Sequence, residues 1–167
     1  QALLDQNTSN ANHNTAVGYQ AGKSVTTATE NTLIGGLSGD ALVDGAANTA
    51  LGFETLTADT KGQNNVAIGH HALSTQNFTS LTSSYNTAVG SQAGLSVTTG
   101  QFNTFVGGLS GDATTTASGN SALGYLSLSS NTTGEFNTAI GREALEANTT
   151  ADNNTAVGFR ASTAVTT

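Results

Sequence analysis

The segment NTAVGSQAGLSVTTGQFNTFVGGLSGDA, residues 86–113, repeats an earlier one, NTAVGYQAGKSVTTATENTLIGGLSGDA, residues 14–41, with 21 of 28 positions identical. In each copy an Asn is followed four residues later by Gly, and the pair returns 17 residues further on. A fixed period of this length is the signature of an architecture in which each repeat stacks on the next. The period therefore decides the fold class.

The Asn and Gly pair recurs nine times, at steps of 17 residues and one of 21. We number the coils from one to nine, and number positions within each coil from its Asn, which is position zero. The coils start at Asn14, Asn31, Asn48, Asn65, Asn86, Asn103, Asn120, Asn137 and Asn154, and their position-four glycines are Gly18, Gly35, Gly52, Gly69, Gly90, Gly107, Gly124, Gly141 and Gly158. The wider step indicates an insertion near residues 78–84. Residues 1–167 are predicted to be a single repeat array, a fragment of a longer fibre, with four coils as a higher unit.

Positions two and three of every coil are apolar, which predicts a short strand buried on both faces, since alternate side chains of a strand point to opposite faces. One face would point into the coil, and the other would need a cover from another layer of the chain or from another subunit. The glycine at position four turns the chain. A second strand is expected over positions six to twelve, where small residues at positions seven and ten suggest close backbone approach. The sequence thus predicts an all-β, parallel β-solenoid of about nine 17-residue coils.

The invariant Asn is predicted to form a structural ladder along the stack. Its side-chain amide carries a donor and an acceptor, so it can bond to the Asn above and below or cap the adjacent turn. A buried amide is satisfied only if the coils stay in register, which explains why all nine copies are kept.

Composition limits the function classes. Among 167 residues there is no Cys, Met, Trp or Pro, charged residues make up 9%, and the net charge is −7 with four cationic side chains. Disulfides and thiolate chemistry are excluded. No basic patch for nucleic acid is expected, and no apolar run approaches the roughly 20 residues of a membrane span.

The motif NVAIGHHAL at Asn65 resembles the repeats of YadA-like heads of trimeric autotransporter adhesins, which are left-handed parallel β-rolls. The motifs NTAVGYQAG, NTALGFETL, NTAIGREAL and NTAVGFRAS resemble repeat arrays of phage tail fibres and bacterial surface fibres. The resemblance implies a left-handed homotrimer outside the cell, on a virion tail fibre or a cell surface. It also implies contact with a host glycan or protein receptor, whose binding residues it does not indicate.

No catalytic, metal or cofactor site is predicted. His13, His70 and His71 lack clustered ligands, and Asp40 and Asp112 are interpreted as turn residues. Glu143 and Glu146 are expected on a solvated surface strand. The sequons at Asn77 and Asn131 are attributed to the Asn- and Thr-rich composition.

Aromatic residues recur at position five, as Tyr19, Phe53, Tyr125 and Phe159, and could cover a seam between subunits or form exposed stacking platforms for a glycan. The sequence favours a structural and adhesive fibre, a phage tail fibre shaft or receptor-binding region, with a bacterial adhesin head as the alternative.

A further alternative is an ice- or surface-binding solenoid, based on Thr columns at position one (Thr15, Thr32, Thr49, Thr87 and Thr104) and at position twelve. Two observations speak against it: position one shares a face with position three, which is expected to be buried, and adjacent Thr pairs should point to opposite faces. A β-helical acyltransferase is disfavoured because hexapeptide repeats and a fixed catalytic His are missing. The chain is therefore expected not to be an enzyme.

Overall fold

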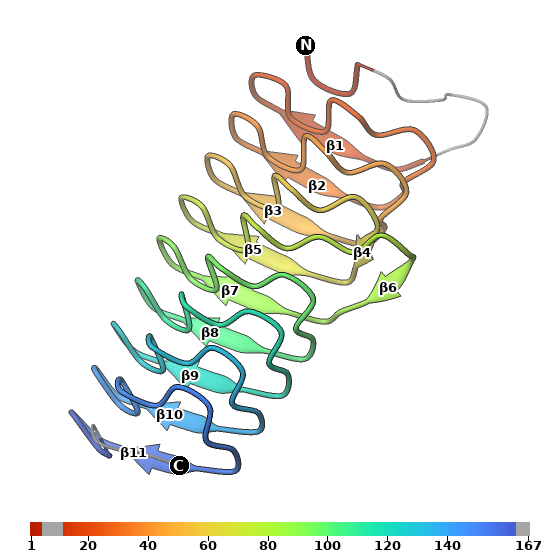
Figure 1. Ribbon diagram of the computed structural model, residues 1–167. Helices are drawn as coiled ribbons and strands as arrows, with labels where there is room; N and C mark the ends of the chain where they lie inside the picture. Colours follow the sequence, from red (N-terminus) through yellow and green to blue (C-terminus); the bar gives the residue numbers. More distant parts are fainter. Residues whose placement is uncertain (5–11, 163–167) are drawn as a thin grey trace.

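The chain folds into a stack of similar coils that carries one long sheet, as the computed structural model shows (Figure 1). The structure describes residues 1–4 and 12–162. Nine three-residue strands form the sheet: β1 (Thr15–Val17), β2 (Thr32–Ile34), β3 (Thr49–Leu51), β5 (Val66–Ile68), β7 (Thr87–Val89), β8 (Thr104–Val106), β9 (Ser121–Leu123), β10 (Thr138–Ile140) and β11 (Thr155–Val157). All pair in parallel, and the described residues contain no helix, so none could span a membrane. The prediction of an all-β, parallel solenoid with 17-residue coils is confirmed.

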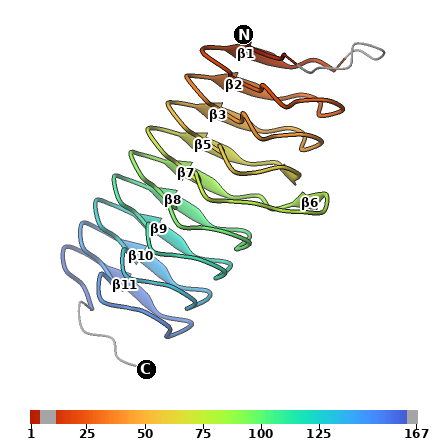
Figure 2. The same ribbon diagram turned by 45° about the horizontal axis from the view of Figure 1, so that its top comes forward.

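Every step of the sheet pairs identical positions of neighbouring coils. Thr15 lies opposite Thr32, and the same register holds where the step is 21 residues, with Ala67 opposite Ala88. The insertion leaves the stack as a lateral excursion, in which β6 (Thr82–Ser83) pairs with β4 (Gly62–Gln63) and projects from the side (Figure 2). The insertion is therefore accommodated outside the main sheet.

The glycine at position four is required by both its conformation and its surroundings. Gly18 has φ +136°, and a Cβ there would lie 2.4 Å from the carbonyl oxygen of Gly35 in the next coil. An L-residue would be strained at this φ and would collide with a backbone atom that cannot move aside. The glycine column thus permits the coils to approach closely at the end of each strand.

The second strand expected over positions six to twelve is wrong, since this segment is a succession of turns. Position six has a left-handed φ in coils one to nine, for example +55° at Gln20 and +58° at Leu37, and position eight has one as well. Alternating left-handed residues curl the chain instead of extending it. The small residues at position seven are buried in coils one to eight, whereas those at position ten lie nearer the surface.

The nine Asn side chains form a continuous ladder. In each of its eight steps the backbone N–H of one Asn donates to Oδ1 of the Asn in the preceding coil, at 2.9–3.0 Å. In most coils Nδ2 donates to the carbonyl oxygen of position fourteen, as from Asn103 to Ala117 at 2.9 Å. The amide therefore ties the strand to the last turn of its own coil and to the coil above.

The insertion interrupts this pattern at Asn65, and other polar side chains replace the missing partners. Asn65 Oδ1 accepts from both Asn86 N and Ser84 Oγ, while Asn86 Nδ2 donates to Gln76 Oε1 at 2.8 Å and to Gly100 O at 2.7 Å. Seven of the nine Asn residues, all but Asn14 and Asn154, are at most 1% exposed. The buried amides thus remain satisfied across the irregular coil.

We expect Asn103→Ala to lower the free energy of unfolding by about 2–6 kcal/mol, because the buried Asn120 N–H and Ala117 carbonyl each lose a partner at about 1–3 kcal/mol. Urea unfolding followed by circular dichroism measures the change. The matched control, Thr116→Ala in the same coil, is exposed and should stay within about 0.5 kcal/mol of the unchanged chain. Equal losses in both variants would contradict a structural role for the ladder.

The core explains why four coils form a higher unit. Position two is large in coils two and six, where it is Leu33 and Phe105, and is Ala in the other coils. Position eight is Gly beside these large residues, and a Cβ on Gly39 or Gly111 would lie 2.8 Å or 2.4 Å from the Leu33 or Phe105 side chain.

Four other coils reverse this pairing, whereas in coil five both positions are small, Ala88 and Gly94, and a Cβ on Gly94 would lie 2.9 Å from Leu73 and 3.0 Å from Phe105 of the neighbouring coils. Position two is Ala in coils three, four, seven and eight, and position eight there is a fully buried Leu: Leu56, Leu73, Leu128 and Leu145. Interiors of proteins are close-packed, so a large residue on one side of a thin coil requires a small one on the other. The sequence therefore repeats every four coils because the sizes of the core side chains at positions two and eight repeat with that period.

Exchanging the two sizes within coil two tests this account. Leu33→Ala alone should lower the free energy of unfolding by about 2–5 kcal/mol, because it leaves a cavity. Gly39→Leu alone should lower it by about 1–3 kcal/mol or more, because it overpacks the coil. The double variant reproduces the Ala50 and Leu56 arrangement of coil three and should be more stable than either single variant. If thermal unfolding shows that the double variant loses as much stability as the two single variants together, the two side chains do not compete for the same space in the core.

Candidate functional site: the outer face of the sheet

The outer face of the sheet exposes an aliphatic column at position three. Val17, Leu51, Leu123, Ile140 and Val157 are 39–67% exposed, and the same position in the other coils is half-buried. Position two of the same strands points inward, where eight of its nine residues are buried. The strand is thus apolar on both faces as predicted, but within residues 1–4 and 12–162 no second layer of the chain covers the outer one.

One edge of this face is the column at position five, which we call the exit edge: Tyr19, Gly36, Phe53, His70, Ser91, Gly108, Tyr125, Arg142 and Phe159. Phe53 stacks on His70 with ring centroids 5.8 Å apart and an interplanar angle of 14°. The Arg142 guanidinium lies 5.8 Å from the Tyr125 ring and 5.7 Å from the Phe159 ring. These ring faces are turned toward neighbouring coils along the rod, which leaves less ring face for a sugar.

The opposite edge carries a second aromatic column that the sequence reasoning missed. It is the residue just before each Asn, which we call the entry edge: His13, Glu30, Ala47, Asn64, Tyr85, Phe102, Gly119, Phe136 and Asn153. Tyr85, Phe102 and Phe136 are 54–59% exposed, and the first two stack with centroids 6.0 Å apart. The signal is present in the sequence as Tyr or Phe directly before Asn86, Asn103 and Asn137.

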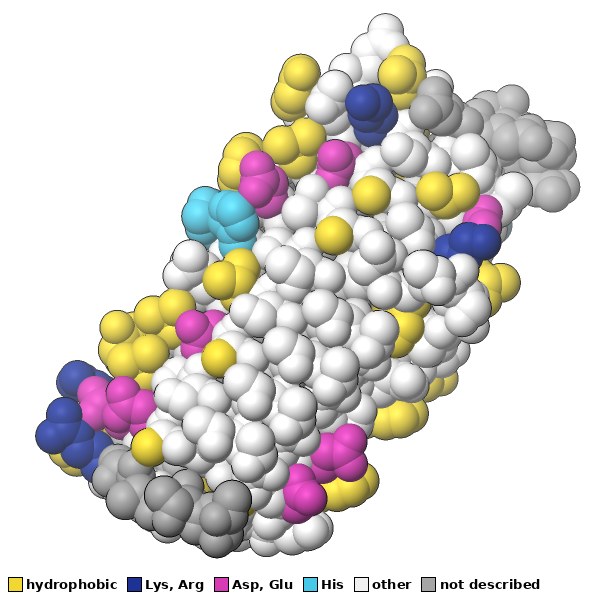
Figure 3. All heavy atoms as spheres, viewed as in Figure 1, with side chains coloured by type: hydrophobic (Ala, Val, Ile, Leu, Met, Phe, Trp, Pro, Cys, Tyr) yellow, Lys and Arg dark blue, Asp and Glu magenta, His cyan; other side chains and the backbone are white. Residues whose placement is uncertain are grey.

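Figure 3 shows hydrophobic side chains along both long edges of the rod, mixed on the left with His and charged side chains, while the face between the edges in this view has few hydrophobic or charged side chains. All exposed large hydrophobic residues of the described chain except Leu4 and Leu81 lie on the two edges or in the aliphatic column between them. A concentration of exposed apolar side chains on one face makes that face the candidate interaction site.

The Thr columns lie differently from the expectation. Position one is on the outer face beside position three, and neither column is buried in the single chain, so the argument against a surface-binding role does not hold. Among the described residues, the position-one Thr hydroxyls have no hydrogen-bond partner within the chain, whereas position-twelve hydroxyls donate to backbone carbonyls, as from Thr115 to Thr132 at 3.0 Å. The Thr pairs at positions twelve and thirteen lie in bends and do not point to opposite faces of a strand.

The polar residues considered as metal ligands do not assemble into a centre. His71 Nε2 lies 3.4 Å from Glu54 Oε2, and His70 lies beside it on the exit edge. Asp40 accepts a hydrogen bond from Thr57 at 2.5 Å, and burial raises the pKa of Asp112. No group of three His, Cys, Asp or Glu side chains that could hold a metal ion occurs in the part of the chain that the structure describes.

The expectation that Glu143 lies on a solvated strand is wrong. Glu143 follows β10 at position six, is 4% exposed, and accepts hydrogen bonds from both Arg160 and Arg142. The bond from Arg160, with that from Arg142, lowers the pKa of Glu143 despite burial. Two cations of neighbouring coils therefore share one carboxylate; the 17-residue period places Arg160 beside Glu143, but residue type did not indicate that the carboxylate is buried.

The two sequons have different surroundings. Asn77 is exposed on the insertion coil, where its Oδ1 accepts from Thr60 at 3.2 Å. Asn131 is fully buried and donates to the Gly134 carbonyl, so its side chain is inaccessible to a modifying enzyme in the folded chain.

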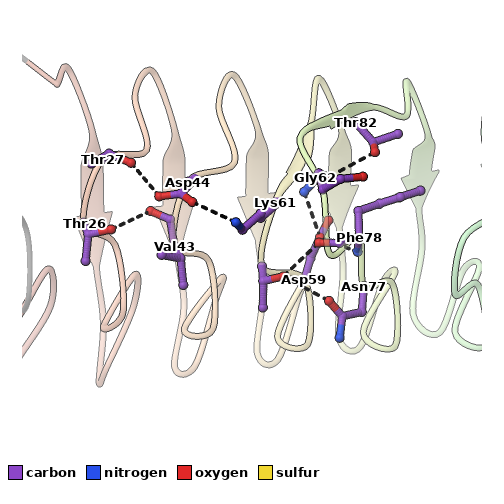
Figure 4. A network of polar contacts seen from close by, with 12 residues as sticks. Thr26, Thr27, Val43, Asp44, Asp59, Lys61, Gly62, Asn77, Phe78 and Thr82 are labelled. Atoms are coloured by element: carbon purple, nitrogen blue, oxygen red, sulfur yellow. Dashed lines mark hydrogen bonds and ion pairs between the residues drawn. The ribbon is translucent and has the colours of Figure 1, made fainter.

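A buried carboxylate of coil three, next to the insertion coil, accepts three hydrogen bonds. Asp59 Oδ1 accepts from the backbone N–H groups of Gly62 at 2.9 Å and Phe78 at 3.2 Å, and Oδ2 accepts from Gln76 Nε2 at 2.6 Å. Figure 4 shows Asp59 with Gly62 and Phe78, beside the surface chain of hydrogen bond and ion pair that joins Thr27, Asp44 and Lys61. The hydrogen bond from Thr27, with Lys61, lowers the pKa of Asp44, whereas burial raises that of Asp59.

Because its folded pKa is raised, Asp59 should make stability fall as pH increases. The loss of stability that comes from ionising this buried carboxyl group is absent below the unfolded pKa of about 3.9 and is complete above the folded pKa. The free energy of unfolding, measured in urea from pH 3.5 to 7, should therefore fall for the unchanged chain relative to Asp59→Asn, which does not titrate there. A relative stability that rises with pH would contradict this assignment.

Comparisons with protein-family models, curated proteins and solved structures gave no match to this chain. The fold and the outer face are therefore the basis for any functional conclusion.

Proposed function

We propose that the chain is a segment of an extracellular structural and adhesive fibre that assembles as a homotrimer. The observation that carries the proposal is the aliphatic column at position three, which is exposed along the rod and flanked by aromatic edges. Burial of apolar surface contributes about 25 cal/mol per Å², so a second and third copy would gain stability by covering this face. The continuous sheet supplies the rigid shaft.

The remaining parts of the proposal rest on the motif resemblance stated above. A left-handed coil and a phage tail fibre shaft or receptor-binding region follow from the NTAIG-type repeats, with a bacterial adhesin head as the second source. In such a fibre, three chains would present identical lateral surfaces to a host receptor. Linked sites of this kind raise the overall affinity above that of each weak contact. The low charge and the self-paired backbone agree with a structural role.

Light scattering coupled to size exclusion tests the assembly. The unchanged chain should show three times its mass of 16.6 kDa. The double variant Leu123→Glu with Ile140→Glu should be monomeric, because it places charges in the exposed column. The matched control, Thr133→Glu with Thr150→Glu, adds the same charge at exposed bend positions and should remain trimeric. A monomeric unchanged chain would contradict the proposal.

A second candidate, a binder of ice or another ordered surface, is favoured by one specific observation. The position-one Thr hydroxyls stand in register on an exposed face and have no partner within the described chain. Their spacing is about 4.8 Å between coils. This role needs the same face that a trimer would bury, so the two candidates exclude each other. A monomer with thermal hysteresis on a cold stage, lost in Thr104→Tyr, would support the second candidate.

A further inference from the structure

In coils three, five, six and seven, an aromatic ring at one edge is matched by Ala, Ser or Gly at the other edge of the same coil. Where the entry edge is aromatic, as at Tyr85 and Phe102, the exit edge of the same coil has Ser91 and Gly108. In coil seven the order is reversed, with Gly119 at the entry edge and Tyr125 at the exit edge.

The full set of pairs is His13 with Tyr19, Glu30 with Gly36, Ala47 with Phe53, Asn64 with His70, Tyr85 with Ser91, Phe102 with Gly108, Gly119 with Tyr125, Phe136 with Arg142, and Asn153 with Phe159. None of these nine coils has Phe or Tyr at both edges, and Phe136 is paired with a cation that already lies beside two rings.

Contact within one coil does not produce this relation. The strand Thr87–Val89 separates the two edges of coil five, and an extended chain rises about 3.3 Å per residue, so Asn86 and Gly90 alone are about 13 Å apart. Edge side chains of the same coil therefore do not fill one another's space in a single chain.

Packing between coils explains only part of the pattern. Rings lie over glycines of the preceding coil, as Phe136 lies over Gly119 and Tyr125 over Gly108. These contacts account for individual glycines along each edge. They do not account for Ser91 opposite Tyr85 or Ala47 opposite Phe53, where the paired residues belong to different edges.

We propose that the entry edge of each coil packs against the exit edge of the same coil in a neighbouring copy, which fixes the axial register of the assembly. The partner is a second copy of this chain, and the inference rests on the proposed homotrimer. Three parallel rods that turn their sheet faces toward a common axis bring the entry edge of one copy to the exit edge of the next. A Phe or Tyr ring then never meets another Phe or Tyr ring at the same level, whereas a shift by one coil would oppose Phe102 with Tyr125.

Cysteine cross-linking tests the pairing, because the chain has no native Cys. The matched variant is Tyr85→Cys with Ser91→Cys, and the register control is Tyr85→Cys with Gly108→Cys, which places the second thiol one coil further along. A disulfide needs Cα atoms about 4.4–6.8 Å apart, so the two thiols of one coil are too distant to join within a chain. Oxidation followed by non-reducing electrophoresis should convert most of the matched variant to covalent trimer and little of the control.

Light scattering on the same samples separates the two proposals. A trimeric mass without matched cross-links, or with equal cross-linking of the register control, would overturn the edge pairing and leave the trimer standing. A monomeric mass of the unchanged chain would contradict the trimer and with it the edge pairing. Circular dichroism that matches the unchanged chain would show that both variants keep the fold.

Discussion

The structure depends on the hydrogen bonds of one buried amide, repeated in every coil. Each Asn at position zero must satisfy a donor and an acceptor away from water, and a lost partner costs about 1–3 kcal/mol. The amide meets this requirement by accepting from the next coil and, in most coils, donating to its own last turn. These bonds form only when coils are stacked in register, so a single local requirement imposes long-range order on the rod.

The insertion coil shows how strongly this requirement acts. Four additional residues would break the ladder if they stayed in the stack, so they leave it in a side segment where β6 pairs with β4 of coil three. Ser84 Oγ then donates to Asn65 Oδ1, and Gln76 Oε1 accepts from Asn86 Nδ2, which also donates to its regular position-fourteen carbonyl, that of Gly100. Asp59, fully buried, fixes the orientation of Gln76 by accepting from its amide. The irregular coil therefore has Gln76 and Ser84 buried beside its ladder Asn.

A thin solenoid has little volume inside each coil, and this limits where its apolar residues can go. Position two fills the interior, and its size is balanced against position eight. Position three has no interior to enter, since it lies on the opposite face of the same three-residue strand. An aliphatic residue kept there in all nine coils raises the question of what covers it, and the proposed homotrimer answers it. The same geometry leaves the two aromatic edges free to contact neighbours.

The sequence by itself determined the coil length, the parallel register, the Asn ladder and the glycine corner, because each depends on residues that recur at a fixed spacing. It also placed an apolar residue on each face of the strand. Only the tertiary structure decided that positions six to twelve are turns, since left-handed φ values at residues such as Leu37 and Leu56 are not signalled by residue type. It alone showed that Glu143 is buried between two arginines and that Tyr85, Phe102 and Phe136 form an exposed edge. These features arise where residues 17 apart in sequence become neighbours, and the stacking of the whole coil sets their surroundings.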